Sequence, residues 1–336
     1  MALAVRNRAG ETVTLSDKPF ARGGEAEVYD VPKYPNAVVK IFHPQVLSGR
    51  GELLQRKIDA MSSHPVFQPM KQDSQLSWPL FSVFDEAGRW RGYAMRRAKG
   101  VRMSLLAHAM AYRDHFPGID RFRLTGYLIT LLQAIDRLHR VGVMVGDYNP
   151  ANFLCDPQSD QVYLIDCDSW QVKIDGTLYP CPVAAPDMLP PELHNLALGQ
   201  VTRTLESERF SLAILLFKVI MLGRHPFDVV GGEDPVSNIR KGYFPYGLGG
   251  GGIPKGPWYN IWSHLSFRIK EQFIATFKEG TTNPALRTPV EKWIEVFRIY
   301  QSDMQKGFLS SEIRPEKPKD KQYRGKQSVS QPIATS

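Results

Sequence analysis

The chain has 336 residues, of which 43% are hydrophobic and 23% are charged, a balance typical of a folded protein with a sizeable core. This composition excludes a wholly disordered chain, a collagen-like repeat and a small disulfide-rich scaffold. The net charge of +8 suits a nucleic-acid, anionic-lipid or phosphate-rich partner. However, basic and aromatic residues are not interleaved in the clusters typical of nucleic-acid binding, so we expect no nucleic-acid partner.

The cysteines and the apolar runs indicate a cytoplasmic location. Cys155, Cys167 and Cys181 form no Cys-x-x-Cys pair, which argues against a zinc site or a disulfide framework and fits a reducing cytosol. No apolar run approaches the roughly 20 residues that a membrane span needs, so no membrane association is expected. Residues 1–6 are too short and too soon charged for a secretory signal.

The pattern of apolar residues changes along the chain from strand-like to helical. Residues 11–15 and 37–42 are rich in β-formers, and two further strands flank the turn at 85–88, the second ending at 92–95. Apolar residues at helical spacing predict helices at 51–61, 122–140, 210–221, 267–277 and 290–300. The sequence therefore predicts an α+β protein of two lobes, the first mostly strands and the second mostly helices.

Two weak signals for phosphate binding lie in the first lobe. Gly23 and Gly24 stand between two expected strands, where glycine lets backbone N–H groups approach a phosphate; a plain hairpin turn explains them equally well. Lys40 lies inside a hydrophobic strand twelve residues after Val28. This lysine either points outward on an exposed face or supplies a fixed cation to a polyphosphate.

A more specific signal lies in the second lobe. Asp147 and Asn152 are five residues apart in a tight loop after a helix, and Asp166 follows a short β-like stretch. This order brings three oxygen ligands together, as a base for a hydroxyl group and hard Mg²⁺ ions require. A turn explains each residue singly but not the ordered set together with Lys40.

In the order of these elements, the chain from about residue 20 to residue 300 resembles a protein kinase domain. The glycine loop, the strand lysine, the Asp…Asn loop and the second aspartate occur in the family's order. The segment 189–192 resembles the family's Ala-Pro-Glu segment, and Arg287 stands where the family places the arginine that pairs with its glutamate, here Glu192. The resemblance implies a bilobal kinase-like fold with a β-rich N-lobe (1–98) and a helical C-lobe (99–301).

The resemblance also implies roles for individual residues. Asp147 would orient or deprotonate the acceptor hydroxyl, Asn152 and Asp166 would hold Mg²⁺, and Lys40 would steady the α- and β-phosphates of ATP. The positions expected to bind the nucleotide are Gly23, Gly24, Val28, Lys40, Glu52, Met95 as gatekeeper and Arg97 in the hinge. Two carboxylates compete as partner of Lys40: Glu52, which we favour, and Asp59, which has the usual separation but a shorter side chain.

Two motif triplets depart from the family's pattern. The His-Arg-Asp triplet is replaced by Val145-Gly146-Asp147, which removes an arginine that usually meets a phosphorylated activation loop. We therefore expect activity to be independent of phosphorylation of that loop. Val145 should keep the local contact apolar.

The Asp-Phe-Gly triplet is replaced by Asp166-Cys167-Asp168. Cys167 should likewise keep its contact small and apolar. Asp168 replaces a glycine and should limit the backbone flip that inactivates many kinases. Its carboxylate is expected to be solvated, with a position facing the metal as the alternative. A lysine and a threonine that bond each other in serine/threonine kinases are replaced by Asn149 and Ala185, so the acceptor preference is less certain.

The expected function is that of an ATP- and Mg²⁺-dependent protein kinase acting on hydroxyl side chains, with Ser/Thr favoured. The alternatives are a pseudokinase that binds a nucleotide or a partner without transfer, and a small-molecule phosphotransferase. The variant loop resembles those of divergent bacterial kinases, some of which are encoded beside metal-dependent phosphatases and von Willebrand-type proteins, so such partners are expected beside a protein substrate. A glycine-rich insertion near 247–257 and a disordered basic tail over 302–336 complete the expected organisation.

Overall fold

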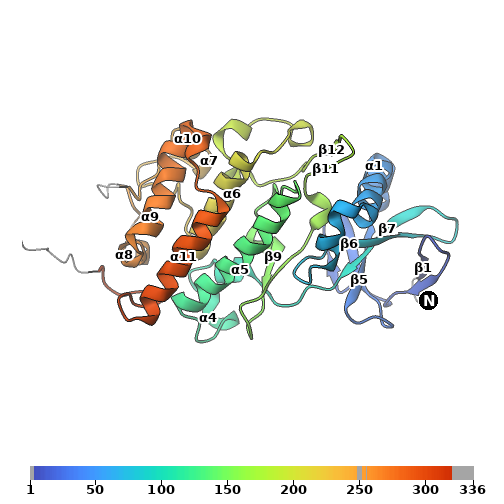
Figure 1. The fold of residues 1–336 in the computed structure, drawn as a ribbon, viewed down its shortest axis with the longest axis horizontal. Coiled ribbons are helices and arrows are strands. Elements are labelled where there is room, and N and C mark those ends of the chain that lie inside the picture. Colours follow the sequence, from blue (N-terminus) through green and yellow to red (C-terminus); the bar gives the residue numbers. More distant parts are fainter. Residues whose placement is uncertain (1–3, 248–251, 255, 320–336) are drawn as a thin grey trace, which may run out of the picture.

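The computed structural model describes residues 4–247, 252–254 and 256–319. It is an α+β structure in which a curled antiparallel sheet forms the N-terminal part and helices form the C-terminal part (Figure 1). This arrangement is consistent with the expected bilobal kinase-like fold. Within the described ranges, no helix combines the length and the apolar character needed to cross a membrane.

The N-lobe sheet has seven antiparallel strands in the order β2-β1-β6-β7-β5-β4-β3. The strands are β1 (Ala4–Arg6), β2 (Thr12–Thr14), β3 (Ala21–Arg22), β4 (Ala26–Asp30), β5 (Ala37–Phe42), β6 (Pro79–Phe84) and β7 (Trp90–Arg96). Side chains of a strand alternate between its two faces. In β5, Val39 and Ile41 therefore enter a small outer core, whereas Val38 and Phe42 enter the main core, and Lys40 lies on the same face as these two.

A glycine allows the close pairing of β5 with β7. Gly92 has φ +156°, and a Cβ atom at this position would lie 1.9 Å from the carbonyl oxygen of Lys40. Any other residue would push the two strands apart. The strand that carries Lys40 is therefore held against β7 at a position where only glycine fits.

Helix α1 (Pro44–Ser63) covers the inner face of the sheet (Figure 1). It begins earlier than the expected helix at 51–61, because Pro44 is a favourable first helical residue. The helix is interrupted at Arg50, whose φ and ψ of −144° and 15° are not helical. The sequence pattern thus identified the part after this kink. The buried face of that part carries Lys57 beside Leu54, Ile58 and Met61.

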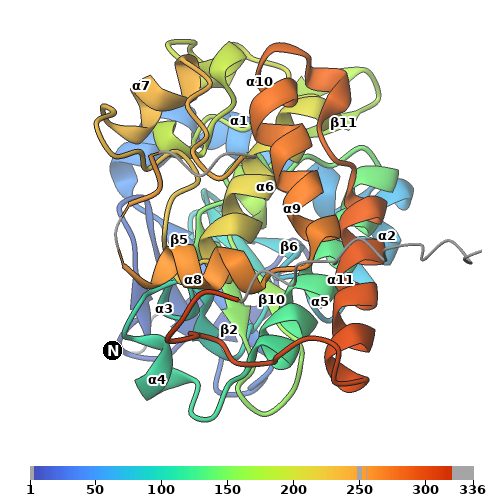
Figure 2. The same cartoon turned by 90° about the vertical axis from the view of Figure 1, so that its left-hand side faces the viewer.

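The C-lobe is built around helix α6 (Leu205–Ile220), which is buried nearly all round. Around it lie α5 (Arg121–Arg140), α7 (Pro235–Arg240), α8 (Pro257–His264), α9 (Phe267–Ile274) and α11 (Val290–Gln305), with the short helices α3 (Met103–Leu106), α4 (Tyr112–His115) and α10 (Gly280–Thr282) (Figure 2). The short helix α2 (Gln68–Gln72) follows α1 in the N-lobe and contacts it. The long helices agree closely with the sequence expectation. Their ends have local causes: Asp120 accepts from the N–H of Arg123 to cap α5, and Thr204 forms a capping box with Ser207 to start α6.

Short strands at the junction of the lobes position the loops that carry the predicted site. Strands β8 (Val101–Arg102), β9 (Phe153–Cys155) and β10 (Val162–Leu164) form one small sheet, and β11 (Val172–Ile174) pairs with β12 (Thr177–Tyr179). The loop with Asp147 lies between α5 and β9, and Asp166 follows β10.

Residues 306–319 differ from the disordered tail that the sequence predicted. This segment turns back after α11 and lies along the C-lobe (Figure 2). Arg121 donates hydrogen bonds to the carbonyl oxygens of Glu312 (3.1 Å) and Ile313 (2.9 Å), and Asn260 donates to that of Glu316 (2.7 Å). The backbone carbonyls of a polar segment thus satisfy donors of the folded lobe. Residues 320–336, and residues 248–251 and 255 of the glycine-rich insertion, lie outside the described residues.

Candidate active site

A buried carboxylate holds the loop that carries Asp147. Glu208, on the first turns of α6, is 1% exposed and accepts hydrogen bonds from the backbone N–H groups of Val145 (2.8 Å) and Gly146 (2.9 Å). It also accepts from the hydroxyl of Tyr148 at 2.7 Å. Charge-assisted bonds of this kind are stronger than neutral ones, so Glu208 fixes the backbone on both sides of Asp147.

Glu208 was missed as a site residue from the sequence, because the apolar repeat predicted the helix only from residue 210. The available signal was a glutamate next to an apolar run that has no polar face. Such a residue needs partners because a buried charge without hydrogen bonds is costly.

Asp147 and Asn152 are brought together as predicted. The Asn152 amide donates to Asp147 Oδ2 at 3.2 Å, and the intervening turn is stabilised by Asn149, whose side chain accepts from the N–H of Ala151. Burial raises the pKa of Asp147 above its ordinary value, and the nearby Asp166 adds to the effect. The Oδ1 atom of Asp147 is buried and has no hydrogen-bond partner among the described residues. A carboxylate in this state is suited to accept a proton from a bound hydroxyl group.

Asp166 lies beside this loop. A backbone bond from the N–H of Ile165 to the carbonyl of Asn152 (3.0 Å) joins the end of β10 to the Asp147 loop. Asp166 itself has a left-handed backbone (φ 64°, ψ 34°), which is unusual for a residue other than glycine and turns the chain sharply here. Its side chain is 38% exposed, so this carboxylate is accessible from outside.

The donor set at this point fits Mg²⁺. Asn152 uses its amide nitrogen on Asp147, which leaves its amide oxygen free, and Asp166 supplies a carboxylate. Carboxylate and amide oxygens are the ligands that this ion accepts in proteins. Among the described residues, no three His, Cys, Asp or Glu side chains converge as a metal-binding group. Asn152 and Asp166 are therefore the residues that would hold Mg²⁺, with the remaining ligands from phosphate and water.

Lys40 points into the site and not outward. Its Nζ atom lies 2.7 Å from Asp166 Oδ1 and 2.7 Å from Asp168 Oδ1, and its side chain is 11% exposed. Burial alone would lower the pKa of Lys40, but the two carboxylates raise it above the ordinary value. Burial likewise opposes ionisation of Asp168, and Lys40 nevertheless holds the pKa of Asp168 below its usual range. Both groups are therefore charged at neutral pH.

The prediction that a carboxylate of helix α1 pairs with Lys40 is wrong. Glu52 has a side chain that is 84% exposed and lies 3.5 Å from Arg56, and Asp59 accepts from Arg8 (2.6 Å) and Ser82 (2.7 Å). The two residues are turned away because the buried face of α1 is occupied by Leu54, Lys57, Ile58 and Met61. Glu52 is therefore not placed to contact a nucleotide beside Lys40.

The expectation of a solvated Asp168 is also wrong. Its residue is 5% exposed, and the hydroxyl of Tyr93 donates to its Oδ1 at 2.6 Å. Lys57 donates to its backbone carbonyl at 2.7 Å. Burial lowers the pKa of Lys57 to about 8, although Asp168 opposes that shift. Sequence reasoning missed Tyr93 and Lys57; a lysine on the apolar face of a helix was the available signal for the latter.

Three of the residues expected around the nucleotide, Val28, Lys40 and Met95, share one face of the N-lobe sheet. Val28 is paired with Lys40 across β4 and β5, and Lys40 is paired with Tyr93 across β5 and β7. Met95 lies two residues after Tyr93, on the same face, and both belong to the main core. Arg97 is already engaged: its backbone N–H donates to Asn36 (2.9 Å), and its guanidinium pairs with Asp30.

Gly23 and Gly24 form the tip of the β3–β4 hairpin, where the N–H of Gly23 donates to the carbonyl of Ala26 at 2.9 Å. Neither glycine has a positive φ, and a Cβ atom at Gly24 would meet nothing within 4 Å. The protein's own backbone and packing therefore do not require glycine at this tip. The hairpin and the phosphate-loop interpretations are both compatible with this geometry.

The apolar members of the two replaced triplets pack as expected. Val145 and Cys167 are buried in the main core. Gly146 has φ +70°, and a Cβ atom there would lie 2.7 Å from the sulfur of Cys181, so the segment after β12 rests directly on the Asp147 loop. Arg203 lies beside Gly146 and lowers the pKa of Asp147, partly opposing the effect of burial. The independence from loop phosphorylation stays a prediction.

The expected pair between Glu192 and Arg287 is confirmed. Arg287 donates from Nη1 to Glu192 Oε1 at 2.6 Å and from Nη2 to Oε2 at 2.8 Å. This contact joins the segment before α6 to the start of α11. It lies in the C-lobe, where it supports the region next to the Asp147 loop.

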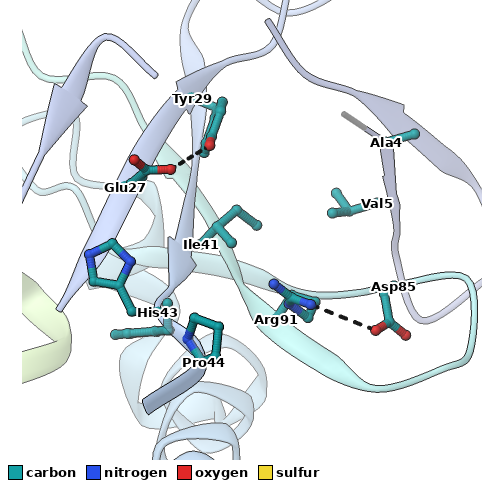
Figure 3. A pocket seen from close by; sticks show the side chains of 10 residues that line it. Ala4, Val5, Glu27, Tyr29, Ile41, His43, Pro44, Asp85 and Arg91 are labelled. Atoms are coloured by element: carbon teal, nitrogen blue, oxygen red, sulfur yellow. Dashed lines mark hydrogen bonds and ion pairs between the residues drawn. The ribbon is translucent and has the colours of Figure 1, made fainter. Parts of the chain in front are cut away.

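A hollow in the N-lobe does not belong to this site. It has a volume of about 260 Å³ and is lined by Val5, Glu27, Tyr29, Ile41, His43 and Arg91, among others (Figure 3). Ile41 points to the outer face of β5, whereas Lys40 points to the inner face. The hollow and the cluster around Lys40 therefore lie on opposite faces of the sheet.

Comparison with known proteins finds two relatives at modest identity. The chain is 29% identical over 231 residues to the protein named protein kinase YegI of Escherichia coli K12, covering 68% of this chain and 34% of that protein. It is 30% identical over 224 residues to the protein of the same name from Escherichia coli O157:H7, covering 66% of this chain and 33% of that protein. The chain thus spans about a third of the length of the curated relatives it matches. No family model matches the chain. The two relatives support a protein kinase-like family and a kinase activity at this distance.

Proposed function

We propose that this protein is an ATP- and Mg²⁺-dependent protein kinase that transfers the γ-phosphate to hydroxyl side chains of a protein, with Ser/Thr favoured. The observation that carries the proposal is the convergence of Lys40, Asp147, Asn152 and Asp166, which are spread over 126 residues of sequence. Lys40 contacts Asp166, Asn152 contacts Asp147, and the backbone bond between Ile165 and Asn152 joins the two pairs. A fixed cation, a buried base and two oxygen ligands at one site are the parts that phosphoryl transfer requires. The relatives named protein kinase support the same activity.

Each residue has a role in the proposed reaction. Lys40 binds the α- and β-phosphates, and Asn152 and Asp166 hold Mg²⁺, which neutralises charge on the phosphates when it is bound. The oxygen of the acceptor hydroxyl bonds to the γ-phosphorus, and Asp147 accepts the proton that this hydroxyl group loses. The bond from that phosphorus to the bridging oxygen of ADP breaks, and ADP leaves with the electron pair.

The rigid support of Asp147 serves this reaction. Glu208 holds the backbone before Asp147, and Tyr148 ties the residue after it to the same carboxylate. The base is therefore in position before the substrate arrives, and the reaction does not have to order the loop. A bacterial cytoplasmic setting and a metal-dependent phosphatase counterpart remain part of the proposal.

A second candidate function is a nucleotide-binding module without transfer. One observation favours it: Asp166, which would hold Mg²⁺, already lies 2.7 Å from Lys40. In such a module this ion pair would persist when a nucleotide binds. In the proposed kinase, the phosphates and Mg²⁺ replace it.

The test is Mg²⁺-dependent transfer of labelled phosphate to the protein itself and to a generic protein acceptor. Wild type is compared with Asp147→Asn and Asp166→Asn, and with Asp175→Asn, a matched control whose side chain is 83% exposed. We expect labelling by wild type and by the control, and none by the two site variants. Nucleotide binding without labelling by wild type would establish the second candidate instead. Mass spectrometry of the labelled product would identify the acceptor residue.

A further inference from the structure

The cluster around Lys40 differs from the sequence prediction in two ways: the partner carboxylate does not come from helix α1, and that helix contributes a second cation. The helix α1 contributes a lysine, Lys57, and the carboxylate comes from Asp168, two residues after Asp166. We propose that Asp168 is the positioning residue that holds Lys40 for phosphate binding, and that Lys57 anchors Asp168 to helix α1. This inference rests on the proposed function, because positioning Lys40 matters only where a polyphosphate binds.

The contacts of Asp168 support this role. Lys40 donates to both of its carboxylate oxygens, at 2.7 and 2.9 Å, and Tyr93 donates to Oδ1 at 2.6 Å. Asp168 is 5% exposed, so its partners are all internal. The carboxylate is thus fixed by strands β5 and β7 and cannot turn away to solvent.

Asp166 and Asp168 differ in their exposure and in the number of their contacts with Lys40, which indicates different roles. Asp166 makes one contact with Lys40 and has a side chain that is 38% exposed, whereas Asp168 makes two and has a side chain that is 5% exposed. The accessible carboxylate of Asp166 can release Lys40 and bind an incoming ligand in its place. The buried carboxylate keeps its contact with Lys40 during that exchange. Asp168 is therefore the permanent partner and Asp166 the exchangeable one.

Charge balance explains why Lys57 and Asp168 occur together. Two lysines and two aspartates meet here, and their formal charges cancel. A glycine in place of Asp168 would leave Lys40 and Lys57 facing Asp166 alone. Burying a cation without a partner is strongly unfavourable. The aspartate at 168 and the lysine at 57 thus compensate for each other.

The arrangement also changes what keeps Lys40 in place. Asp168 belongs to the loop after β10 and not to α1, so the ion pair does not depend directly on the position of that helix. Helix α1 contributes one hydrogen bond to the cluster, from Lys57 to the Asp168 carbonyl. We therefore expect Lys40 to remain aligned when α1 shifts.

The test moves the carboxylate from the loop to the helix. Four proteins are compared: wild type, Asp168→Gly, Lys57→Glu, and the double variant that carries both changes. The matched control is Arg56→Glu, the same charge reversal at a neighbouring position of α1 whose side chain is 63% exposed. The readouts are the melting temperature without nucleotide, and KM for ATP and kcat.

We expect each single variant to melt below wild type and to raise KM for ATP by roughly tenfold or more, because Asp168→Gly leaves two lysines with one carboxylate and Lys57→Glu places three carboxylates beside one lysine. The double variant should recover most of both losses, because Glu at position 57 supplies the missing carboxylate. The control should behave as wild type. If Asp168→Gly fails to fold, Asp168→Asn replaces it in the set, and recovery of folded protein by the double variant is itself the expected result.

Losses that add in the double variant, or a single variant Asp168→Gly with wild-type melting temperature and KM, would overturn the inference. The proposed function fails in a different way, when wild type itself transfers no phosphate. In that case the melting temperatures and the affinity for ATP measured by direct binding still compare the four proteins. The positioning role is then judged from recovery of those two quantities alone.

Discussion

Arg287 donates hydrogen bonds to both carboxylate oxygens of Glu192, at 2.6 and 2.8 Å, although the two residues are 95 positions apart in the sequence. Its guanidinium also donates to the carbonyls of Gly280 (2.7 Å) and Glu206 (3.0 Å) and lies 5.0 Å from the ring centre of Phe210. The arginine side chain is fully buried, whereas that of Glu192 is 39% exposed. One cation thus connects the segment before α6, α6 itself and the turn before α11.

Glu192→Gln should destabilise the fold by roughly 2 kcal/mol, because a buried guanidinium loses its charged partner while it keeps its bonds to two carbonyls. Chemical denaturation at neutral pH measures the free energy of unfolding. Glu295→Gln is the control, since its pair with Lys292 is solvent-exposed and should contribute less than about 1 kcal/mol. Equal effects of the two substitutions would contradict the structural role of the buried pair.

Glu208→Gln should reduce kcat by about 100-fold, because one of the two buried N–H groups beside Asp147 loses its acceptor and the base is displaced. Tyr148→Phe removes one donor to this carboxylate and leaves both backbone N–H bonds in place, so it should have a smaller effect. Transfer of labelled phosphate measures kcat. Hydrogen exchange at Val145 and Gly146 should rise in Glu208→Gln.

Glu206→Gln is the matched control for that experiment. It lies on the first turn of the same helix, but its side chain is 42% exposed. We expect a change in stability below about 1 kcal/mol, from its favourable position at the helix N-terminus, and no change in kcat. A wild-type kcat in Glu208→Gln would show that the loop is held by other contacts.

His225 should make the stability of the protein depend on pH. Burial lowers the pKa of His225 from 6.5 to about 4, and its ring bonds the carbonyl of Asp187 and the N–H of Phe227 in the neutral form. The unfolded chain takes up a proton below pH 6.5 and the folded chain does so only near pH 4. Stability from this group is therefore complete above pH 6.5 and falls by about 3 kcal/mol as the pH drops to 4.

The measurement is the free energy of unfolding between pH 7 and pH 4. His225→Asn cannot titrate, so its curve should be flatter than that of wild type in this window. Lys218, Asp187 and Asp228 face the ring and stay in place in the variant. His115→Asn, at an exposed position, is the control. A wild-type slope in His225→Asn would assign the pH dependence to another group.

Arg121→Met should release the segment 306–319 from the C-lobe. The side chain supplies bonds to the carbonyls of Glu312 and Ile313, whose loss makes local opening roughly tenfold more frequent or more. Limited digestion with chymotrypsin at Phe308, which is 71% exposed, measures the opening. Arg140→Met, at the opposite end of α5, is the control. Unchanged cleavage would show that other contacts, such as those of Asn260 with Glu316 and of Ser263 with Lys319, hold the segment.

Local patterns along the sequence predicted most of the fold. The β-forming residues at 37–42 identified β5 but not the face on which Lys40 lies, and the apolar repeat of 122–140 identified α5 within one residue. The start of α1 was not predicted, because the kink at Arg50 interrupts the apolar repeat. The placement of 306–319 was not predicted either, because backbone carbonyls make its contacts and leave no side-chain signal.

The site was predicted in part for a similar reason. Asp147 and Asn152 are close in sequence, and their contact follows from the turn between them. The partner of Lys40 depends instead on how three distant segments pack, and the sequence pointed to Glu52, with Asp59 as the alternative, and not to Asp168. Only the fold shows that α1 turns a lysine towards the cluster.

The three cysteines of the chain lie at three different places around this centre, so the reactivity of each thiol reports local opening at its own place. Cys155 lies in β9, Cys167 follows Asp166, and Cys181 rests on Gly146. Burial raises the pKa of Cys181 to about 11 and raises those of the other two thiols above their ordinary value, so none is reactive while its surroundings are closed. The rate at which each thiol is alkylated therefore measures how often the structure around that cysteine opens. No label has to be introduced into the protein for this measurement.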